Sequence, residues 1–359
     1  MPLSFSPFTS KQVNEAGKFL IGRIGKNRTI TDSRGVLPAL ARVDIWRRTH
    51  AYPLRVVSSF VRRYVKEFDQ GAVVSSRMKR MGSMISKLER NPNMQLSTMQ
   101  DIGGCRAIVE SIANVQALRE YFDTKLKSHL EAPRKYDYVF EPKADGYRSV
   151  HFVVRYQPRR VPEHLKGIDF AKQSKRIEIQ LRSQLQHQWA TAVETVDLFT
   201  GQTLKIGGGN SEWKRFFALA SSLFARKENS PLVPDTPANH EELIEELRSL
   251  WKGLRVPSLL YGWADAMRTT EVQHETGGPF DIYLVSINTE HMVTGITTFK
   301  LEHVEAAQQM YVQAEQNPNI NAVLVSVSDI SELRNAFPNY YGDTSEFVDG
   351  VGGMITAVP

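Results

Sequence analysis

The chain has one cysteine, Cys105, among its 359 residues, which excludes an internal disulfide and fits a reducing cytoplasm. No run of about 18 apolar residues occurs, so we expect no membrane-spanning helix. Residues 1–19 mix proline, serine, lysine and glutamate without an apolar segment, so we expect no signal peptide. These absences predict a cytoplasmic protein without a membrane partner.

Two common nucleotide-binding patterns are also missing. The stretch Gly207-Gly208-Gly209-Asn210 fits neither the P-loop nor the dinucleotide fingerprint, and it predicts a flexible break. Apolar residues make up 41% of the chain and charged residues 23%, which excludes wholesale disorder and predicts a soluble globular protein. The net charge of +6 is compatible with phosphate-rich ligands or nucleic acid.

Apolar spacing and prolines divide the chain into four segments. Residues 1–70 are predicted to be helical, and residues 71–227 to form an α+β domain with a mixed β-sheet flanked by helices. Three prolines predict a linker over residues 228–239. Residues 240–359 predict a second, small α+β module of ββαβα order, for which regulation is one interpretation.

The stretch Ser75 to Arg90 has helical spacing, with an apolar stripe that includes Met81, Ile85 and Leu88. The opposite side carries a polar row made of Lys79, Ser83, Lys87 and Arg90. Such a row can bind a polyphosphate through charge-assisted hydrogen bonds. A solvated basic helix face is the alternative.

Next comes Asp101-Ile102-Gly103-Gly104-Cys105-Arg106, an acid and two glycines that lead into an alternating, strand-like run. Asp101 is either a turn cap or a functional carboxylate. Glu178, Gln180 and Arg182 share one face of a second alternating run. Glu178 could join Asp101 in holding a hard cation through oxygen ligands, or could belong to a solvent-facing polar row.

A turn with the sequence Asp145-Gly146 lies between these two runs. It would bring Lys143, Tyr147 and His151 near one another. A tyrosine beside cations is a plausible platform for stacking a base, although an ordinary hairpin tip would have the same sequence.

Along the chain the four motifs are the basic helix with Lys79 and Lys87, then Asp101 to Arg106, Lys143 to His151, and Glu178 to Arg182. Together, and in this order, they resemble the synthetase domain of the RelA/SpoT family, which makes the alarmones pppGpp and ppGpp. The resemblance covers roughly residues 45 to 227. It implies a nucleotidyltransferase-like fold and the transfer of diphosphate from ATP to the 3′-hydroxyl of GDP or GTP, with release of AMP. It also implies Mg²⁺ as cofactor.

The resemblance assigns roles to individual residues. Arg77 and Arg106 would sandwich the adenine of ATP, while Lys79, Ser83, Lys87 and Arg90 would hold its phosphates. Asp101 would bind Mg²⁺, and Glu178 would share the metal or deprotonate the attacking hydroxyl. Tyr147 would stack on the acceptor guanine, with Lys143 and His151 on its phosphates or ribose. Gln180 and Arg182 would support the site.

Asp145 replaces the asparagine usual in the family's acceptor loop, which puts the acceptor in doubt. Some small members of the family are toxins that modify the 3′ end of tRNA or make adenosine alarmones. Basic residues between Arg47 and Arg63 would suit tRNA. A catalytically dead nucleotide-binding protein is a third hypothesis, and a homo-oligomer is compatible with all three.

Overall fold

The computed structural model describes residues 6–21, 23, 35–129, 131–156, 174–200, 204, 208–257, 259–261, 282–288, 293–317, 320–325 and 344–356. Five strands form the central sheet: β1 (Val73–Met78), β2 (Gly103–Val109), β3 (Glu131–Asp137), β4 (Val150–Tyr156) and β5 (Lys175–Ser183). Their spatial order is β3-β4-β5-β2-β1. Strands β2 and β5 are parallel and the other pairs are antiparallel. The predicted mixed α+β architecture is therefore confirmed.

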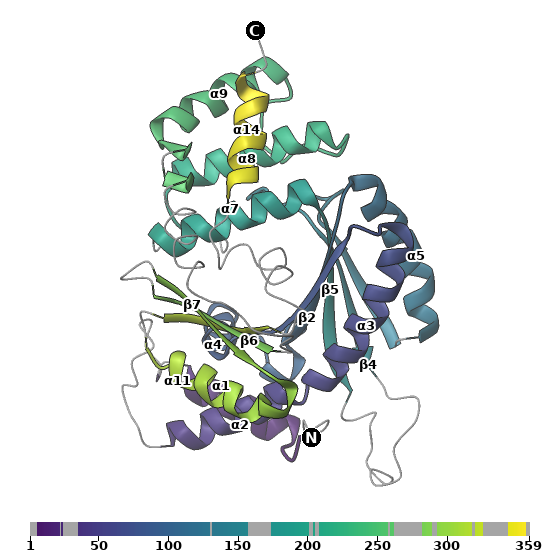
Figure 1. The fold of residues 1–359 in the computed structure, drawn as a ribbon, viewed down its shortest axis with the longest axis vertical. Helices are drawn as coiled ribbons and strands as arrows, with labels where there is room; N and C mark the ends of the chain where they lie inside the picture. The colour runs from purple at the N-terminus through teal and green to yellow at the C-terminus, as the bar shows by residue number, and fades with distance from the viewer. Residues whose placement is uncertain are drawn as a thin grey trace.

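The two faces of this sheet differ because side chains alternate along each strand. Ile177, Ile179 and Leu181 of β5 are fully buried on one face, in a core shared with helices α3 (Ala51–Phe68) and α5 (Ile112–His129). Both helices lie on the same side of the sheet in Figure 1. The intervening residues, Glu178, Gln180 and Arg182, therefore point to the other face.

The N-terminal helices α1 (Ser10–Leu20) and α2 (Val36–Arg48) pack with α4 (Met81–Arg90) and the short 3-10 helix Leu96–Thr98. Helix α4 is shorter than the helix predicted over residues 75–90, and that prediction was wrong in its first half. Residues 73–78 form β1, which pairs with β2 along its whole length, from Val73 opposite Ile108 to Met78 opposite Gly103. Strand pairing thus overrides the helical spacing, and Lys79 lies between strand and helix.

Three further strands extend the sheet beyond β1. They are β6 (Ile282–Asn288), β7 (Val293–Phe299) and β8 (Ile320–Val325), and they accompany a 3-10 turn (Leu301–His303) and helix α11 (Val304–Ala314). The register places Arg77 of β1 opposite Val325 of β8. The predicted ββαβ order is present, whereas the helix expected over residues 331–337 lies outside the described residues.

A second group of helices covers the top of the molecule in Figure 1: α7 (Gln184–Thr200), α8 (Ser211–Lys227), α9 (His240–Gly253) and α14 (Ser345–Thr356). All four contribute to one hydrophobic core. Elements on both sides of residues 228–239 therefore share this core, and the proposed domain boundary stays a prediction. No helix in the described ranges is long and apolar enough to cross a membrane.

Phe347 anchors α14 to the earlier part of the chain. Its ring is 1% exposed and contacts Phe216, Phe217 and Phe224 of α8. We expect Phe347→Ala to lower the free energy of unfolding by about 3 kcal/mol, because the truncation leaves a cavity. Urea unfolding measures this, with the 41% exposed Met310→Ala as the control. An equal, small effect of both substitutions would show that α14 is not part of the cooperative core.

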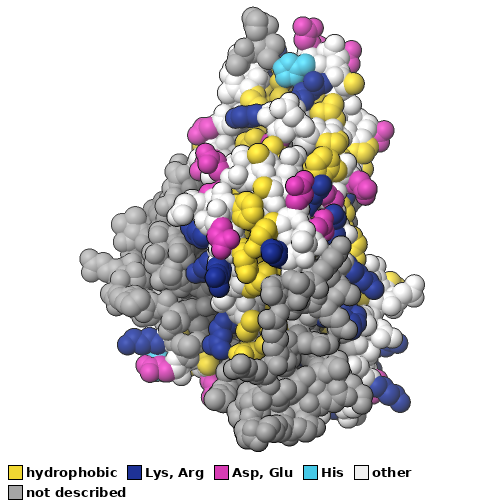
Figure 2. All heavy atoms as spheres, turned by 90° about the vertical axis from the view of Figure 1, so that its right-hand side faces the viewer, with side chains coloured by type: hydrophobic (Ala, Val, Ile, Leu, Met, Phe, Trp, Pro, Cys, Tyr) yellow, Lys and Arg dark blue, Asp and Glu magenta, His cyan; other side chains and the backbone are white. Residues whose placement is uncertain are grey.

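The surface on the α3 and α5 side is mixed in character. In Figure 2, hydrophobic side chains run down the middle of this face, with Lys and Arg side chains beside them in its lower half. Phe68 and Phe140 are among the large apolar residues more than a third exposed. Scattered exposure of this kind is common on soluble proteins.

Candidate active site

A cavity of about 270 Å³ opens on the polar face of the sheet, between its strands and helices α7 and α8. The strands supply many of its polar side chains, among them Arg77 from β1, Arg106 from β2, His151 from β4, and Glu178, Gln180 and Arg182 from β5. Lys79, Asp101, Lys143, Asp145 and Tyr147 join them from the connecting segments. Motifs up to about 100 residues apart in sequence therefore line one cavity.

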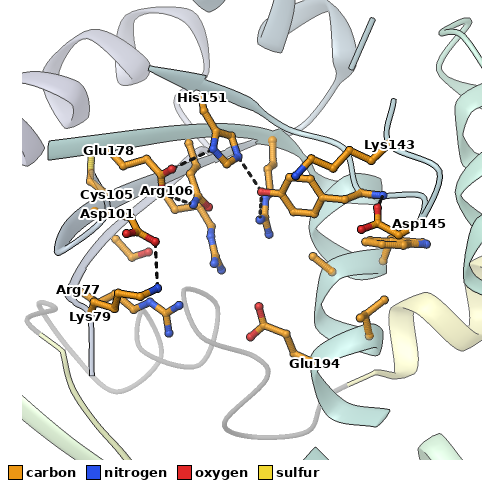
Figure 3. A pocket seen from close by; sticks show the side chains of 18 of the residues that line it. Arg77, Lys79, Asp101, Cys105, Arg106, Lys143, Asp145, His151, Glu178 and Glu194 are labelled. Atoms are coloured by element: carbon orange, nitrogen blue, oxygen red, sulfur yellow. Dashed lines mark hydrogen bonds and ion pairs between the residues drawn. The ribbon is translucent and has the colours of Figure 1, made fainter. Parts of the chain in front are cut away.

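Asp101 lies at one side of the cavity, just before β2, and two lysines bind it, of which Figure 3 shows Lys79. Lys79 Nζ and Lys87 Nζ each donate to Asp101 Oδ2 at 2.9 Å. Burial alone would raise the pKa of Asp101, but the two lysine charges outweigh it and lower that pKa to about 2. Asp101 is therefore ionised at neutral pH. Its other oxygen, Oδ1, is buried without a hydrogen-bond partner.

A chain of hydrogen bonds crosses the sheet from Glu178. His151 Nδ1 lies 3.0 Å from Glu178 Oε1, and Gln180 Nε2 donates to Glu178 Oε2 at 2.7 Å. On the far side of the imidazole, His151 Nε2 lies 2.7 Å from the hydroxyl of Tyr147, which also accepts from Arg182 at 2.8 Å. In Figure 3 these hydrogen-bonded side chains follow one another along one wall of the cavity. It fixes both carboxylate oxygens of Glu178.

Charges within this chain shift its pKa values in opposite directions. Burial opposes ionisation of Glu178, yet the hydrogen bond from His151 lowers its pKa below the ordinary value. Burial disfavours the charged imidazole, but Tyr147 and Glu178 raise the pKa of His151. Burial likewise disfavours tyrosinate, and the charges of Arg182 and His151 outweigh it, lowering the pKa of Tyr147 to about 7.

A titration of the tyrosines tests this arrangement. We expect tyrosinate absorbance equivalent to one phenol to develop around pH 7 in the wild-type protein, well below the ordinary pKa of about 10. Tyr147→Phe should abolish this early step and leave the later ones. Tyr138→Phe is the matched control, because burial raises the pKa of Tyr138. An early step that survives in Tyr147→Phe would contradict the assignment.

The two arginines expected to sandwich adenine are neighbours across strands. Ser75 lies opposite Arg106, and Arg77 lies opposite Gly104, so Arg77 and Arg106 share the cavity face one step apart. Gly104 leaves this position without a side chain. Burial lowers the pKa of Arg106 to about 9, and the neighbouring charge of Arg182 adds to the effect. The Nε atom of Arg106 is buried without a hydrogen-bond partner.

The loop that carries Tyr147 is held by its own turn and by α8. Asp145 Oδ1 accepts the backbone N–H of Tyr147 at 2.9 Å, so the residue that departs from the family pattern closes the turn. Gly146 has φ +89°, and an added Cβ would lie 3.0 Å from the carbonyl oxygen of Phe217. Arg148, 3% exposed, donates to Ser221 of α8 at 3.2 Å. This loop therefore depends on α8 for its position.

Three of the residues predicted to bind phosphate, Ser83, Lys87 and Arg90 of α4, do not line the cavity. Lys87 contacts a lining residue, because its Nζ donates to Asp101 Oδ2. The Tyr147 ring is also less free than predicted, because Trp189 and His151 lie edge-on to it and Lys143 Nζ lies 5.2 Å from its centroid. His187 of α7 is buried and does not line the cavity.

Sequence reasoning missed the wall formed by the two helices. Trp189 and Glu194 of α7 and Lys214 of α8 line the cavity opposite the sheet. Figure 3 shows Glu194 pointing into it. Trp189 and Glu194 are five residues apart, a spacing that gave no face-sharing signal, and Lys214 comes from a separate helix.

The oxygen ligands that the cavity offers fit a hard divalent cation. Asp101 and Glu178 both line it, both have lowered pKa values, and the charge of Asp101 acts on Glu178. The unpartnered Oδ1 of Asp101 is an acceptor without a donor. Within the described residues no group of three or more metal-binding side chains occurs. Two carboxylates, with substrate phosphates completing the shell, are a usual Mg²⁺ arrangement.

One part of the chain is similar to known proteins. Residues 76–196 match the family model described as "Region found in RelA / SpoT proteins". GTP pyrophosphokinase YjbM of Bacillus subtilis is 31% identical over 120 residues, which cover 33% of this chain and 52% of that protein. An uncharacterized protein of Mycobacterium tuberculosis is 34% identical over 126 residues, covering 34% and 38%. The chain thus matches about half, or less, of each relative's length.

Among solved structures, small alarmone synthetase 1 of Bacillus subtilis bound to its product pppGpp aligns with a TM-score of 0.40 and 23% identity. The alignment covers 50% of this chain and 89% of that one. The matched residues 76–196 begin within β1 and end within α7, so they include the second half of β1 and all of β2 to β5. Most of the residues that line the cavity lie in the stretch that matches the model of a region found in RelA/SpoT proteins.

Proposed function

We propose that the chain transfers diphosphate from ATP to the 3′-hydroxyl of GDP or GTP, giving ppGpp or pppGpp and AMP. The observation that carries this proposal is the arrangement of two carboxylates in one cavity. Asp101 lies between two lysines, and Glu178 lies at the end of a hydrogen-bond chain from Tyr147. The first suits a polyphosphate donor and the second suits a hydroxyl acceptor.

On the donor side, Lys79 and Lys87 would bind phosphate oxygens, and Arg77 and Arg106 would stack on the adenine through their planar guanidinium groups. Asp101 would orient the two ammonium groups, since both donate to its Oδ2. Asp101 and Glu178 would hold Mg²⁺, which supplies neutralisation of the charge on the transferred phosphates. An in-line displacement needs the donor held in this way.

On the acceptor side, the 3′-hydroxyl oxygen would attack the β-phosphorus of ATP. The bond from that phosphorus to the oxygen bridging the α- and β-phosphates breaks, and AMP leaves. Glu178 would take the hydroxyl proton, because its low pKa keeps it ionised and His151 and Gln180 fix its orientation. Tyr147, with Lys143 near its ring, would contact the guanine.

The test is label transfer by the purified full chain. With ATP labelled in its terminal phosphates, Mg²⁺ and GDP or GTP, we expect a labelled 3′-diphosphorylated guanine nucleotide and unlabelled AMP. Labelled inorganic phosphate with no labelled nucleotide would contradict the proposal. The same incubation without an acceptor is the control for simple hydrolysis.

A second candidate acceptor is the 3′ end of tRNA. Tyr136 and Phe140 are 37% and 42% exposed on the segment before the acceptor loop, and exposed aromatic rings can stack single-stranded bases. Deacylated tRNA, an adenine nucleotide and GTP offered in competition would separate the candidates. Label in GTP alone favours the first proposal, and label in tRNA alone favours the second.

Control by residues 240–359 is a further part of the proposal. The hydroxyl of Tyr311 in α11 accepts the backbone N–H of Met81 at the start of α4, 3.2 Å away. Strand β8 meets β1 at Arg77. Both contacts join the C-terminal elements to the donor side. Since a fragment ending at Asn229 would also lose α9 and α14, Tyr311→Phe tests this link more cleanly. An unchanged KM for ATP would argue against it.

A further inference from the structure

Arg148 ends the acceptor loop, residues 143–148, and its side chain is buried, with 3% of the residue exposed. Its guanidinium group donates to four oxygens, all of them uncharged. Nε donates to Ser221 Oγ at 3.2 Å, Nη1 to the carbonyl oxygen of Val139 at 3.0 Å and to Ser230 Oγ at 3.2 Å, and Nη2 to the carbonyl oxygen of Pro231. A buried cation without such partners would be costly, so these oxygens fix where Arg148 can lie.

Three of the four oxygens come from one short part of the chain, the second half of α8 and the residues after it. Ser221 lies in α8, and Ser230 and Pro231 follow that helix. All three lie beyond residues 76–196, the stretch that matches the model of a region found in RelA/SpoT proteins. The acceptor loop, which lies inside that stretch, is therefore held by residues outside it.

The residues after α8 are themselves fixed to the sheet. Glu228, which is 7% exposed, accepts a hydrogen bond from Ser183 Oγ at the end of β5 and another from Gln186 Nε2 of α7, at 2.9 Å. Burial lowers the pKa of Arg148 to about 10, and the charge of Glu228 acts against this shift, so Arg148 stays charged at neutral pH. The oxygens around Arg148 thus have a fixed place relative to β5.

Ser221 holds the acceptor loop on both sides of Tyr147. Its Oγ accepts from Arg148 Nε and donates to the carbonyl oxygen of Gly146 at 2.7 Å. The backbone between these two points carries Tyr147, whose hydroxyl accepts from Arg182 at 2.8 Å. Because the charge of Arg182 helps to lower the pKa of Tyr147, a shift of the loop away from Arg182 would raise that pKa.

We propose that Arg148 is a positioning residue for the acceptor, and that Ser221 and residues 228–231 act through it to hold Tyr147 against the acceptor base. Arg148 touches no substrate in this role, because it does not line the cavity. The affinity for the acceptor then depends on a part of the chain outside the matched stretch, whereas the affinity for ATP does not. The inference rests on the proposed function, because that function places the acceptor at Tyr147.

Two adjacent buried serines of α8 provide a matched pair of variants in the full chain. Ser221→Ala removes the hydroxyl that bonds to the acceptor loop. Ser222→Ala, the control, removes a hydroxyl that bonds instead to Val233 and Thr236 after α8. Both serines are at most 2% exposed, so the two substitutions disturb the core to a similar degree. Arg148→Lys is the stronger variant, because it keeps the charge but cannot reach four oxygens at once. Thermal unfolding checks that each variant is folded, and Ser221→Ala decides the test if Arg148→Lys does not fold.

Each protein is measured in two ways, by the KM for GTP and for ATP in the label-transfer assay and by the absorbance titration of its tyrosines. We expect the KM for GTP to rise about tenfold or more in Arg148→Lys and about threefold or more in Ser221→Ala, while the KM for ATP changes by less than about twofold. In both variants the tyrosinate step of Tyr147 should move up from about pH 7 by about one pH unit or more. Ser222→Ala should leave both KM values and the tyrosinate step unchanged.

An unchanged KM for GTP or an unmoved tyrosinate step in Ser221→Ala would overturn the inference and leave the proposed function standing. Equal changes in Ser221→Ala and Ser222→Ala would also overturn it, because they would indicate a general loosening of α8. The titration needs no catalysis, which separates the two proposals. If the wild type transfers no label to any acceptor, the proposed function fails. A tyrosinate step that moves in Ser221→Ala but not in Ser222→Ala would then still show that these contacts position Tyr147.

Discussion

Replacing Asp101 by Asn should lower kcat/KM for diphosphate transfer by roughly 10²–10³-fold, the range seen when one preorganised electrostatic group is removed from an active site. The substitution keeps the shape of the side chain and removes its charge. Lys79 and Lys87, each 2.9 Å from Asp101 Oδ2, would then face a neutral amide. Their mutual repulsion would no longer be balanced, so the proposed phosphate-binding pair would separate.

Two controls separate the roles of Asp101. Asp123→Asn removes an exposed carboxylate that also pairs with a lysine, and should leave activity unchanged. Titration with Mg²⁺ then distinguishes metal binding from lysine positioning. If Asp101 binds the metal, the Mg²⁺ concentration for half-maximal activity should rise in Asp101→Asn. Loss of activity at an unchanged Mg²⁺ requirement would leave Asp101 as a positioning residue only.

Stability gives an independent readout for Asp101. Its pKa is lowered from 3.8 to about 2 in the folded protein, so the ionised form stabilises the fold above pH 4. This contribution is lost as the pH falls through 2. The free energy of unfolding of the wild type should therefore exceed that of Asp101→Asn at pH 7, and the difference should shrink between pH 4 and pH 2. A constant difference would contradict the lysine pairing.

The sequence predicted the polar face of the sheet well because strand alternation is a local signal. Glu178, Gln180 and Arg182 alternate with buried Ile177, Ile179 and Leu181, and their shared orientation follows from that pattern alone. The local pattern of neither segment could predict that Asp101 and Glu178 line the same cavity. It depends on the parallel pairing of β2 with β5, which puts Gly104 opposite Glu178.

Lys79 shows where a local pattern misleads. Its spacing from Ser83 and Lys87 is helical, yet residues 73–78 pair with β2, and the chain turns at Lys79 before α4 begins. The backbone N–H of Lys79 bonds to the carbonyl oxygen of Ile102, which places its side chain beside Asp101. Pairing with β2 therefore makes residues 73–78 a strand in place of the predicted helix. Lys79 nevertheless lines the same cavity as Asp101, although it is not on the helix that the sequence predicted.

The sequence could not predict that α7 and α8 line the cavity or that the C-terminal strands β6 to β8 join the sheet. Both depend on packing between separate segments of the chain. Glu194 and Lys214 enter the cavity only because α7 and α8 pack across the sheet. The C-terminal helix α14, not predicted, takes its place through Phe347 in the α8 core. The contacts of Phe347 join residues more than 100 positions apart, and no periodicity within either segment predicts them.

Replacing Glu178 by Gln should lower kcat by about 10²–10⁴-fold, the usual contribution of a general base, with a smaller change in the KM for either substrate. The amide has nearly the same shape but cannot accept the hydroxyl proton. It would also place a donor against the amide of Gln180 or the imidazole of His151, both of which now contact Glu178. Stopped assays with saturating ATP and GTP measure kcat directly.

The Mg²⁺ dependence of Glu178→Gln decides between its two proposed roles. Because the metal and the proton are separate requirements, excess Mg²⁺ should partly restore activity if Glu178 only shares the metal, and should restore none if Glu178 is the base. The wild-type profile provides a second check. The pKa of Glu178 is lowered by His151, so its carboxylate stays ionised at neutral pH, and log kcat/KM should fall only in acid, below the ordinary glutamate pKa of about 4.3. Full activity in Glu178→Gln at neutral pH would show that Glu178 is neither the base nor a required metal ligand. The hydrogen bonds from Tyr147 through His151 to Glu178 would then have no role in proton transfer.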